Sequence, residues 1–544
     1  MIPLKPTRAA LDRYYQTGQW QHLSLGQWIA RSVAGHPDKL AVSDASGQGI
    51  SYRELEDKAS RLAAFLAACG VGVGDVVVMH LPNWWQTAVV TYASFKLGAV
   101  INPLPPTYGW KDLAFILNKS AAKAIVITGR FRSADYTEHL DRIQDELNLK
   151  PTVVVIGQGS VQLGTSFDEA TAGPLLAQDR HAAPDDPALL LFTSGSESRP
   201  KGAVHTHNTA IFGESTLAST LRLGSEDIGF MASPVTHTSG FMHGLLMTLM
   251  LGASVSLLDI FKGDSAVEQM ARSRATWTMG ATPFLSDVVE SMERSGTRLP
   301  HLRYFLCGGA PIPEVTVRRA QQVGLRVLSI YGATESPPHT ATWPDDPIEA
   351  AWQADGRALP GVEVKAVDEE GRTLPPGVQG EQWSRGPHAF IGYLGEPELS
   401  AKALDAEGWY HSGDLATVGA DGSVRIVGRI KDMIIRGGQN ISAREVEDIL
   451  LEHPACQTVS VVGIPDDRLG ELCCAVVICH PGQTLGFEEM KQFLIGRGVA
   501  RFKLPEFLVL RDAVPTTPSG KIQKFKLREE LKTLNQPPRE KEST

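Results

Sequence analysis

Short runs of apolar, mostly β-branched residues recur along the chain, and segments with helical spacing of apolar positions separate them. Runs that are apolar at every position are typical of parallel strands with both faces covered. The segment from Asn83 to Leu97 has helical spacing and is followed by Gly98, which predicts a helix end before the next strand. This alternation predicts an α/β fold with parallel sheets. The predicted strands begin at Asp75, Ala124, Val153, Ser254, Tyr304 and Arg326.

The pattern changes at about residue 351 to short extended pieces separated by turn dipeptides, which predicts a small β-rich subdomain. A compact mixed unit follows it. Ser442 and Glu445 have the spacing of a capping box, which predicts a helix start. The predicted domains are residues 1–430, with the β-rich subdomain at about 351–430, and residues 431–544. The elements predicted in the second domain are a helix over 442–452, strands from Thr458 and Ala475, and a helix over 487–498.

Composition and charge exclude several classes of protein. The 544 residues include 52 Lys and Arg against 61 Asp and Glu, so the formal net charge is −9 and no net basic field is present to hold nucleic acid. Six cysteines without CxxC spacing favour buried thiols over a metal or redox site. The most apolar stretch, residues 244–258, is too short for a membrane span and predicts a buried helix followed by a buried strand. The amino terminus shows no export signal, so a cytoplasmic protein is expected.

The segment from Leu191 to Gly202, LFTSGSESRPKG, follows a predicted strand and combines hydroxyls, glycines and a lysine. Phosphate binding needs close backbone approach, hydroxyl donors and a cation, and this segment offers all of them. It is not a Walker A loop, because Pro200 stands where the second glycine would be. Alone, the segment also fits a solvated surface turn, so further motifs have to decide between the two interpretations.

Seven segments together resemble the adenylate-forming enzymes, a family that includes acyl-CoA synthetases, firefly-type luciferases and peptide-synthetase adenylation domains. They occur in the family's order and cover most of the chain. The segments are TSGSESRPKG (193–202), PVTHTSG (234–240), CGGAP (307–311), YGATE (331–335), YHSGDL (410–415), GRIKDMIIRGGQNIS (428–442) and PTTPSGKIQK (515–524). The resemblance implies a large amino-terminal domain of two parallel-rich sheets with helices plus the small β-rich subdomain, followed by a small mobile α+β domain.

The resemblance implies roles in activating a carboxylic acid with ATP. Lys521 is expected to contact the carboxylate and an α-phosphate oxygen, where negative charge builds up. Glu335 is expected to bind Mg²⁺, Thr334 to donate to the α-phosphate, and His237 to form a gate between the carboxylate and phosphate sites. Tyr331 offers a stacking face for adenine, and Asp414 and Arg429 bind the ribose. The other expected nucleotide contacts are Thr193, Ser194, Gly195, Ser196, Lys201, Gly309, Ala310, Pro311 and Gly332.

The phosphate segment departs from the family pattern at Glu197 and Ser198, where a threonine and a glycine are usual. Glu197 brings a negative charge toward anionic phosphates, so we expect it to point away or to contact Mg²⁺ or a basic neighbour. His205 and His207 have metal-like spacing, but no carboxylate or cysteine stands close to them in the sequence, and we interpret them as structural.

The resemblance also implies residues for the acceptor and for the acid. Lys431 resembles a hinge about which the small domain turns. Gly437 and Gly438 are expected to form a narrow passage for the pantetheine arm of CoA, because residues without side chains let it pass. Arg501 and Lys503 are expected to meet the phosphates of CoA. The acyl pocket is expected near Phe241, Gly280 and Ala281, with Met242 and Gly332 beside them.

The function implied is an ATP-dependent acid:CoA ligase that releases AMP and pyrophosphate, with Mg²⁺ bound and CoA as co-substrate. The sequence is most similar to bacterial short- and medium-chain acyl-CoA synthetases and cyclohexanecarboxylate-CoA ligases, so an apolar short- or medium-chain or alicyclic acid is expected. The chain ends soon after Lys521, which favours a free thiol as acceptor. Two alternatives stay open: loading of a carrier protein, and a catalytically reduced nucleotide-binding relative. A homodimer is compatible with the resemblance.

Overall fold

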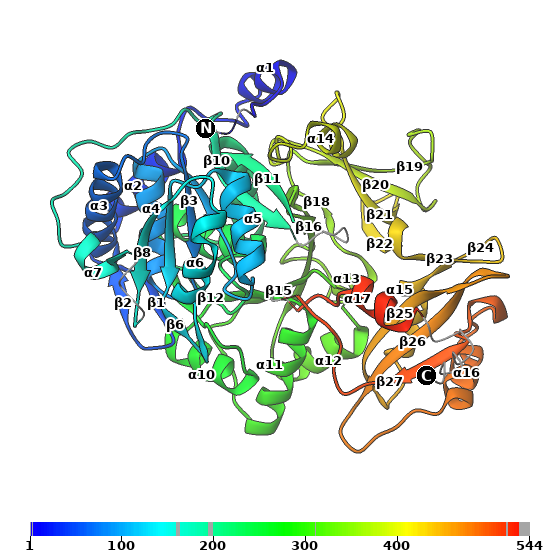
Figure 1. Ribbon diagram of the computed structural model, residues 1–544. Helices are drawn as coiled ribbons and strands as arrows, with labels where there is room; N and C mark the ends of the chain where they lie inside the picture. The colour runs from blue at the N-terminus through cyan, green and yellow to red at the C-terminus, as the bar shows by residue number, and fades with distance from the viewer. Residues whose placement is uncertain are drawn as a thin grey trace, which may run out of the picture.

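The computed structural model describes residues 2, 4–158, 164–193, 200–310, 312–517 and 520–532. Figure 1 shows a large body, blue to green, that contains the first two sheets, and a smaller orange and red unit at the carboxyl end. The yellow sheet of the β-rich segment lies between them along the chain. The α/β fold class predicted from the sequence is confirmed.

The first large sheet has nine strands, parallel in the middle and antiparallel at both edges. Its strands, in spatial order, are β18 (Arg357–Ala358), β17 (Ser336–Ala341), β16 (Val327–Ala333), β15 (Tyr304–Gly308), β14 (Trp277–Gly280), β12 (Ile228–Met231), β13 (Ser254–Leu257), β1 (Leu40–Asp44) and β2 (Gly49–Ser51).

The second sheet has seven strands, and only the β10–β11 pair is antiparallel. Its strands, in spatial order, are β11 (Lys201–Thr206), β10 (Pro187–Thr193), β4 (Val100–Pro103), β3 (Val76–His80), β5 (Ala124–Thr128), β8 (Thr152–Ile156) and β9 (Thr165–Ser166). The six strands predicted from apolar runs are confirmed as β3, β5, β8, β13, β15 and β16.

Helices cover both sheets, and one of them is enclosed completely. In α4 (Gln86–Lys96) every residue from Thr87 to Lys96 is buried, which explains why this helix has no polar face. It ends as predicted, with Gly98 at φ +64° directly after its cap. The other helices of the large body are α1 (Arg8–Gln16), α2 (Leu25–Gly35), α3 (Tyr52–Ala68), α5 (Trp110–Ser120), α6 (Thr137–Ile143), α7 (Phe167–Ala170), α8 (His207–Leu221), α9 (Met247–Leu251), α10 (Gly263–Ser273), α11 (Thr282–Ser295), α12 (Glu314–Gln322) and α13 (Ala350–Gln353).

The apolar stretch at residues 244–258 differs in part from the prediction. A strand does follow, as β13, but the helical part begins earlier, and Ser239–Leu246 forms a π-helix, η3, before α9. π-helices are rare and are frequently found at functional sites. Among the described residues, no helix is long and apolar enough to cross a membrane.

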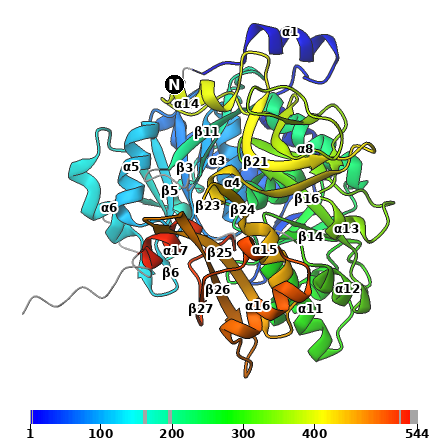
Figure 2. The same ribbon diagram turned by 90° about the vertical axis from the view of Figure 1, so that its right-hand side faces the viewer.

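The β-rich segment forms a four-stranded antiparallel sheet, and the carboxyl-terminal unit a mixed five-stranded sheet with helices (Figure 2). The former contains β19 (Glu363–Val367), β20 (Gly380–Arg385), β21 (Tyr410–Val418) and β22 (Val424–Arg429), with α14 (Pro397–Ala403) between β20 and β21. The latter contains β23 (Met433–Arg436), β24 (Gln439–Ser442), α15 (Ala443–Leu450), β25 (Cys456–Asp466), β26 (Gly470–Cys479), α16 (Phe487–Gly496), β27 (Phe507–Leu510) and α17 (Lys524–Leu531).

The predicted capping box at α15 is half formed. Ser442 accepts a hydrogen bond from the backbone N–H of Glu445, as predicted. The Glu445 carboxylate does not return the bond, because it binds the ammonium group of Lys503 at 2.7 Å instead. An ion pair with a lysine competes well with a single backbone N–H for this carboxylate.

Four of the six cysteines are buried, as expected, but Cys69 is exposed at the end of α3 and Cys479 is half-buried. Burial raises the pKa of the Cys307 thiol to about 12, so this thiol stays protonated.

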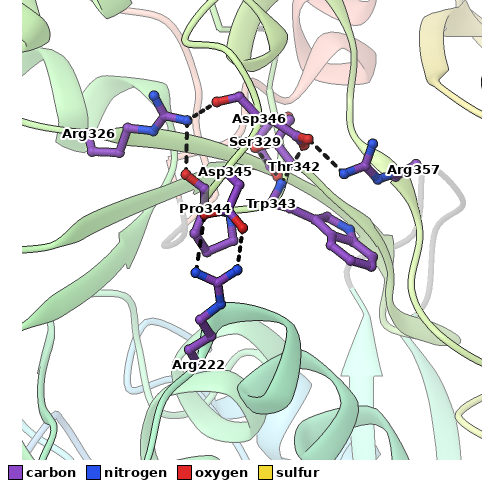
Figure 3. Close-up of polar contacts among 9 residues, drawn as sticks. All are labelled: Arg222, Arg326, Ser329, Thr342, Trp343, Pro344, Asp345, Asp346 and Arg357. Atoms are coloured by element: carbon purple, nitrogen blue, oxygen red, sulfur yellow. Dashed lines mark hydrogen bonds and ion pairs between the residues drawn. The ribbon is translucent and has the colours of Figure 1, made fainter.

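Three arginines fix the loop that follows β17 (Figure 3). Arg222 binds the carboxylate of Asp345, and Arg357 binds that of Asp346 at 2.7 Å. Arg326 donates to backbone carbonyls of the same loop, Pro344 among them at 3.3 Å. The loop lies at one end of the β16–β17 hairpin, and the turn at the other end carries the YGATE segment. These contacts therefore anchor the hairpin that presents part of the site described next.

Candidate active site

A cavity of about 80 Å³ lies where the carboxyl ends of β14, β15 and β16 meet η3. Ligands commonly bind in the crevice outside the carboxyl ends of parallel strands. Four of the predicted site segments meet at this point: PVTHTSG, CGGAP, YGATE and PTTPSGKIQK. The lining residues are Ser233, His237, Thr238, Ser239, His243, Met279, Gly280, Ala281, Gly308, Gly309, Ile330, Gly332, Ala333, Thr334, Pro337, Pro338 and Lys521.

Lys521 reaches this cavity from the carboxyl-terminal unit. Its loop reverses tightly, with the Thr517 N–H donating to the Lys521 carbonyl at 2.7 Å and the Lys521 N–H donating to Thr517 Oγ1 at 3.1 Å. The aliphatic part of the side chain lies over Gly309, where a Cβ would stand only 2.7 Å from Lys521 Cε. Loss of hydration lowers the pKa of Lys521, and the nearby charge of Arg429 adds to the effect.

Asp414 lies on β21 opposite Arg429 at the end of β22. Arg429 Nε donates to one carboxylate oxygen of Asp414 at 2.7 Å, and the Tyr331 hydroxyl donates to the other at 2.6 Å. Burial, followed by the charge of Asp414, holds the pKa of Tyr331 well above its usual value, so the hydroxyl stays a donor. Each carboxylate oxygen keeps a further lone pair for an incoming hydroxyl.

This geometry adds a role that the sequence did not reveal. Tyr331 was predicted as a stacking face; its ring packs on the core of the β-rich sheet, and the His339 ring lies edge-on to it at 4.7 Å between centroids. Its hydroxyl, however, also fixes the position of the Asp414 carboxylate. Asp414 and Tyr331 are 83 residues apart, so no local pattern could have paired them.

Glu335 follows the cavity-lining residue Thr334 and is 9% exposed. One of its carboxylate oxygens accepts a hydrogen bond from the Tyr393 hydroxyl at 2.7 Å. The Lys201 ammonium group lies 5.9 Å from the centre of the Tyr393 ring, on the same side of the site. Sequence reasoning missed Tyr393, whose only local signal was the Gly-Tyr pair at 392–393.

Thr334 is held from two sides. Its hydroxyl shares a hydrogen bond of 2.9 Å with the Thr238 hydroxyl, and its backbone carbonyl lies 2.8 Å from His205 Nε2. Burial lowers the pKa of His205 to about 4, so this histidine is neutral and donates to the carbonyl. His207 accepts from the Leu25 N–H. Both histidines are structural, as predicted, although His205 supports the site directly.

His237 lines the cavity beside Ser239, whose hydroxyl lies 3.1 Å from its Nδ1. Loss of hydration lowers the pKa of His237 to about 3, and the charge of Lys521 adds to the shift. The imidazole is therefore neutral at physiological pH. A neutral side chain at this position adds no charge between an anionic acid and an anionic phosphate.

Two of the three residues expected at the acyl pocket line the cavity. Gly280 and Ala281 line the cavity, but Phe241 does not, because its side chain is fully buried in the main core, as is that of Met242. On a helix, residues four apart lie on one face, whereas residues two apart do not. Ser239 and His243 therefore point into the cavity, and Phe241, halfway between them, points away.

The phosphate segment is described only at its ends. Thr193 and Lys201 are paired in the β10–β11 hairpin, which brings the threonine and the lysine together at the hairpin end. Ser194, Gly195, Ser196 and Pro311, together with Glu197 and Ser198, lie outside the described residues. Ala310 follows Gly309, whose φ of +84° suits a glycine. Gly332 also requires the absence of a side chain, since a Cβ there would stand 3.0 Å from the Ser336 carbonyl oxygen.

The residues expected to bind CoA do not reach the cavity in this arrangement of the domains. Gly437 and Gly438, at φ +57° and +79°, form the two-residue turn between β23 and β24, and both are exposed. The Lys503 ammonium group is paired with Glu445, and Arg501 is exposed. The positive φ angles of this turn are by themselves a sufficient reason for two glycines here.

Lys431 lies in a short 3₁₀ turn, η4 (Ile430–Asp432), that connects β22 to β23. The next residue, Asp432, accepts a hydrogen bond of 2.8 Å from Arg528 in α17. The start of the carboxyl-terminal unit is thereby joined to its last described helix. Lys431 itself is exposed.

Comparison with known proteins agrees with this arrangement. Residues 29–394 match the family model described as AMP-binding enzyme, and residues 445–521 match that of the AMP-binding enzyme C-terminal domain. The medium-chain fatty-acid–CoA ligase of Escherichia coli K12 is 40% identical over 525 residues, which cover 95% of this chain and 92% of that protein. The human mitochondrial medium-chain acyl-CoA ligase is 32% identical over 551 residues, covering 95% of this chain and 89% of that protein.

A solved structure shows the same fold. ATP-bound MatB from Rhodopseudomonas palustris superposes with a TM-score of 0.85 at 30% identity, covering 94% of this chain and all of that one. Both family models match consecutive parts of the chain, and the first alone spans well over half of it. The chain therefore belongs to the AMP-binding family of adenylate-forming enzymes.

Proposed function

We propose that this enzyme is an ATP-dependent ligase that joins a medium-chain carboxylic acid to CoA. In the first step a carboxylate oxygen attacks the α-phosphorus of ATP, and pyrophosphate leaves. In the second step the CoA sulfur attacks the acyl carbon of the acyl-adenylate, its proton is lost, and AMP leaves. The observation that carries the proposal is the placement of Lys521 in a cavity walled by glycine-rich strand ends and η3. The names of the E. coli and human relatives support the acid and the acceptor.

Lys521 would stabilise the first transition state. Negative charge increases on the phosphate oxygens as the carboxylate attacks, and a preorganised cation in a site of low hydration counters it strongly. Thr334 would donate its hydroxyl to an α-phosphate oxygen, with its position set by Thr238 and His205. His237 would separate the acid from the phosphates as an uncharged wall.

The nucleotide would bind across the β-rich sheet and the YGATE turn. Asp414, oriented by Arg429 and Tyr331, would accept the two ribose hydroxyls. Mg²⁺ would be held by the Glu335 carboxylate oxygen that does not accept from Tyr393, a hard oxygen donor of the kind this ion prefers. Bound Mg²⁺ would neutralise charge on the phosphates.

The thiol would arrive after a turn of the small domain about Lys431. In the present arrangement Lys521 lines the cavity, and the Gly437-Gly438 turn is exposed. Rotation would withdraw Lys521 and bring this turn to the cavity as the passage for the pantetheine arm. Arg501, and Lys503 once released from Glu445, would meet the phosphates of CoA.

The test is a panel of acids assayed for AMP release with and without CoA. We expect octanoate and its neighbours in length to give AMP that depends on CoA, together with the acyl-CoA thioester. AMP release that occurs only with an acyl carrier protein would support carrier loading instead. No CoA-dependent AMP release from any acid in the panel would overturn the proposal.

A further inference from the structure

Two of the six cysteines lie opposite each other at the end of the hairpin that β25 and β26 form. Cys456 begins β25, Cys479 ends β26, and the two are direct partners in the antiparallel register. The Cys456 N–H donates to the His453 carbonyl at 2.9 Å, within its own segment of the chain. The His480 N–H donates across the hairpin to the Ala455 carbonyl at 3.0 Å. This pattern identifies the cysteine pair as a non-hydrogen-bonded position of the ladder.

The backbone at this position suits a disulfide. Opposite residues at a non-hydrogen-bonded position have Cα atoms about 4.5 Å apart, closer than at a hydrogen-bonded position. Disulfides join residues whose Cα atoms are about 4.4–6.8 Å apart. The two strands therefore do not have to move for the two sulfurs to be joined.

Both cysteine side chains lie on the same face of the sheet. Cys456 belongs to the buried cluster that α15 and α16 cover, and Cys479 packs against this cluster. The register shifts by one residue between Cys456 and Thr458, which turns the Cys456 side chain to the face of Cys479. Spacing along the chain shows nothing of this, because the partnership depends on the register of the hairpin.

The other four cysteines have no cysteine opposite them. Cys473 and Cys474 lie further along β26, where their partners in the register are a glycine and a valine. Being adjacent on one strand, they point to opposite faces of the sheet. Cys69 and Cys307 belong to the large body of the molecule. All six cysteines are among the described residues, so Cys456 and Cys479 form the one cross-strand pair.

The two thiols differ in exposure, and this sets the order in which they react. Cys456 is 4% exposed, whereas Cys479 is half-buried at the strand end. Burial raises the pKa of the Cys456 thiol to about 12, and the neighbouring Cys479 adds to the shift. Cys456 therefore stays a thiol, and Cys479 is the sulfur that an oxidant in solution reaches first.

We propose that Cys456 and Cys479 are a reversible disulfide site, which a peroxide closes and a thiol reductant reopens. This inference goes beyond the proposed ligase function and does not depend on it. In the first step the Cys479 sulfur attacks one oxygen of hydrogen peroxide, the O–O bond breaks, and a sulfenic acid and one water form. In the second step the Cys456 sulfur attacks that of Cys479, the S–O bond breaks, and the Cys456 proton leaves with the hydroxyl group as a second water. The two electrons that the thiols lose reduce the peroxide.

The experiment treats the reduced full-length protein with hydrogen peroxide in dilute solution. Cys69, exposed at the end of α3, is the internal measure of oxidant exposure, and treatment continues until Cys69 can no longer be alkylated. The protein is then unfolded with an alkylating reagent, and the mass of each cysteine-containing peptide is measured. We expect Cys456 and Cys479 to have lost alkylation together, with the mass of two hydrogens, and dithiothreitol to restore both. Because the bond closes a loop around the hairpin, we also expect the oxidised protein to unfold at a higher urea concentration.

Three variants separate this pair from general oxidation. In Cys456→Ala, Cys479 should gain oxygen and form no disulfide. In Cys479→Ala, a change at a half-buried strand end that leaves the core intact, Cys456 should stay available for alkylation. The matched control is Cys474→Ala, another buried cysteine of the same hairpin whose side chain lies on the opposite face, and it should keep the disulfide.

Several results would overturn the proposal. Full alkylation of Cys456 and Cys479 after Cys69 has been consumed would show that the pair does not react. Oxygen on Cys479 beside an intact Cys456 thiol in the parent would show that the sulfurs do not meet. A disulfide that persists in Cys456→Ala would assign Cys479 to another partner. A disulfide that leaves the resistance to urea unchanged or lowers it would show that the strands have to distort to form it.

Discussion

Gly309 can be tested by adding one methyl group, because the structure shows what that group would meet. The Cβ of Gly309→Ala would stand 2.7 Å from Lys521 Cε, so the lysine chain has to move by about 1 Å to restore ordinary contact. Lys521 has a flexible side chain, and the movement costs the fold little. The backbone costs more, since φ is +84° and a left-handed conformation disfavours alanine by about 1–2 kcal/mol.

The expected effects on stability and on activity therefore differ. We expect a loss of about 1–2 kcal/mol in the free energy of unfolding, from the backbone alone. The displacement of Lys521 weakens its contact with the transition state for adenylation. A misplacement of about 1 Å can reduce the rate of this step roughly 10²-fold. Thioester formation from supplied acyl-adenylate and CoA should continue at the parent rate, because the proposed turn of the small domain withdraws Lys521 before that step.

The assays are acid-dependent pyrophosphate exchange for the first step and thioester formation from supplied acyl-adenylate for the second. The matched control is Gly377→Ala, at φ +81° with nothing within 4 Å of its Cβ, which carries the same backbone cost without the contact. Equal exchange rates in the two alanine variants would show that Lys521 tolerates the displacement, and would refute the reasoning.

Three further substitutions test the assigned roles. Lys521→Ala should lower adenylation by roughly 10²–10³-fold while thioester formation from supplied acyl-adenylate survives, and equal losses in both assays would assign the lysine to the fold or to both steps. Asp414→Asn should mainly raise the KM for ATP, because the ribose contact is present before and during the transition state; an ATP dependence equal to the parent's would remove Asp414 from the nucleotide site. Gly438→Leu should preserve pyrophosphate exchange and abolish thioester formation, with a melting curve to separate a blocked passage from the strain of φ +79°; a well-folded variant with parent thioester activity would contradict the passage.

Features that depend on neighbours in the sequence could be predicted, and those that depend on distant contacts could not. The buried strands and the end of α4 at Gly98 follow from local runs and turn residues. Tyr393 and Glu335 meet across 58 residues, and Glu214 and His243 across 29, with no local signal for either pairing. A pair of this kind exists only once the fold has brought its members together.

The π-helix could not be predicted for a different reason. Residues 239–251 are apolar at nearly every position, so no periodicity distinguishes an α-helix from a wider one. Without a periodicity, the sequence does not show which face of the helix meets the cavity, and the side chain of Phe241 lies in the main core. The capping box predicted at α15 formed only in part, because the Glu445 carboxylate pairs with Lys503, which lies 58 residues away in the sequence.

In the proposed turn of the small domain about Lys431, the bond between Asp432 and Arg528 would make this domain move as a lever. Asp432 is next to the pivot, whereas Lys521 stands on a loop far along the chain, just before the helix that carries Arg528. Because Asp432 is bonded to that helix, a rotation at Lys431 would be transmitted to the Lys521 loop. Removing the bond between Asp432 and Arg528 should loosen this connection. Lys521 should then reach the cavity less often, although the cavity itself is unchanged.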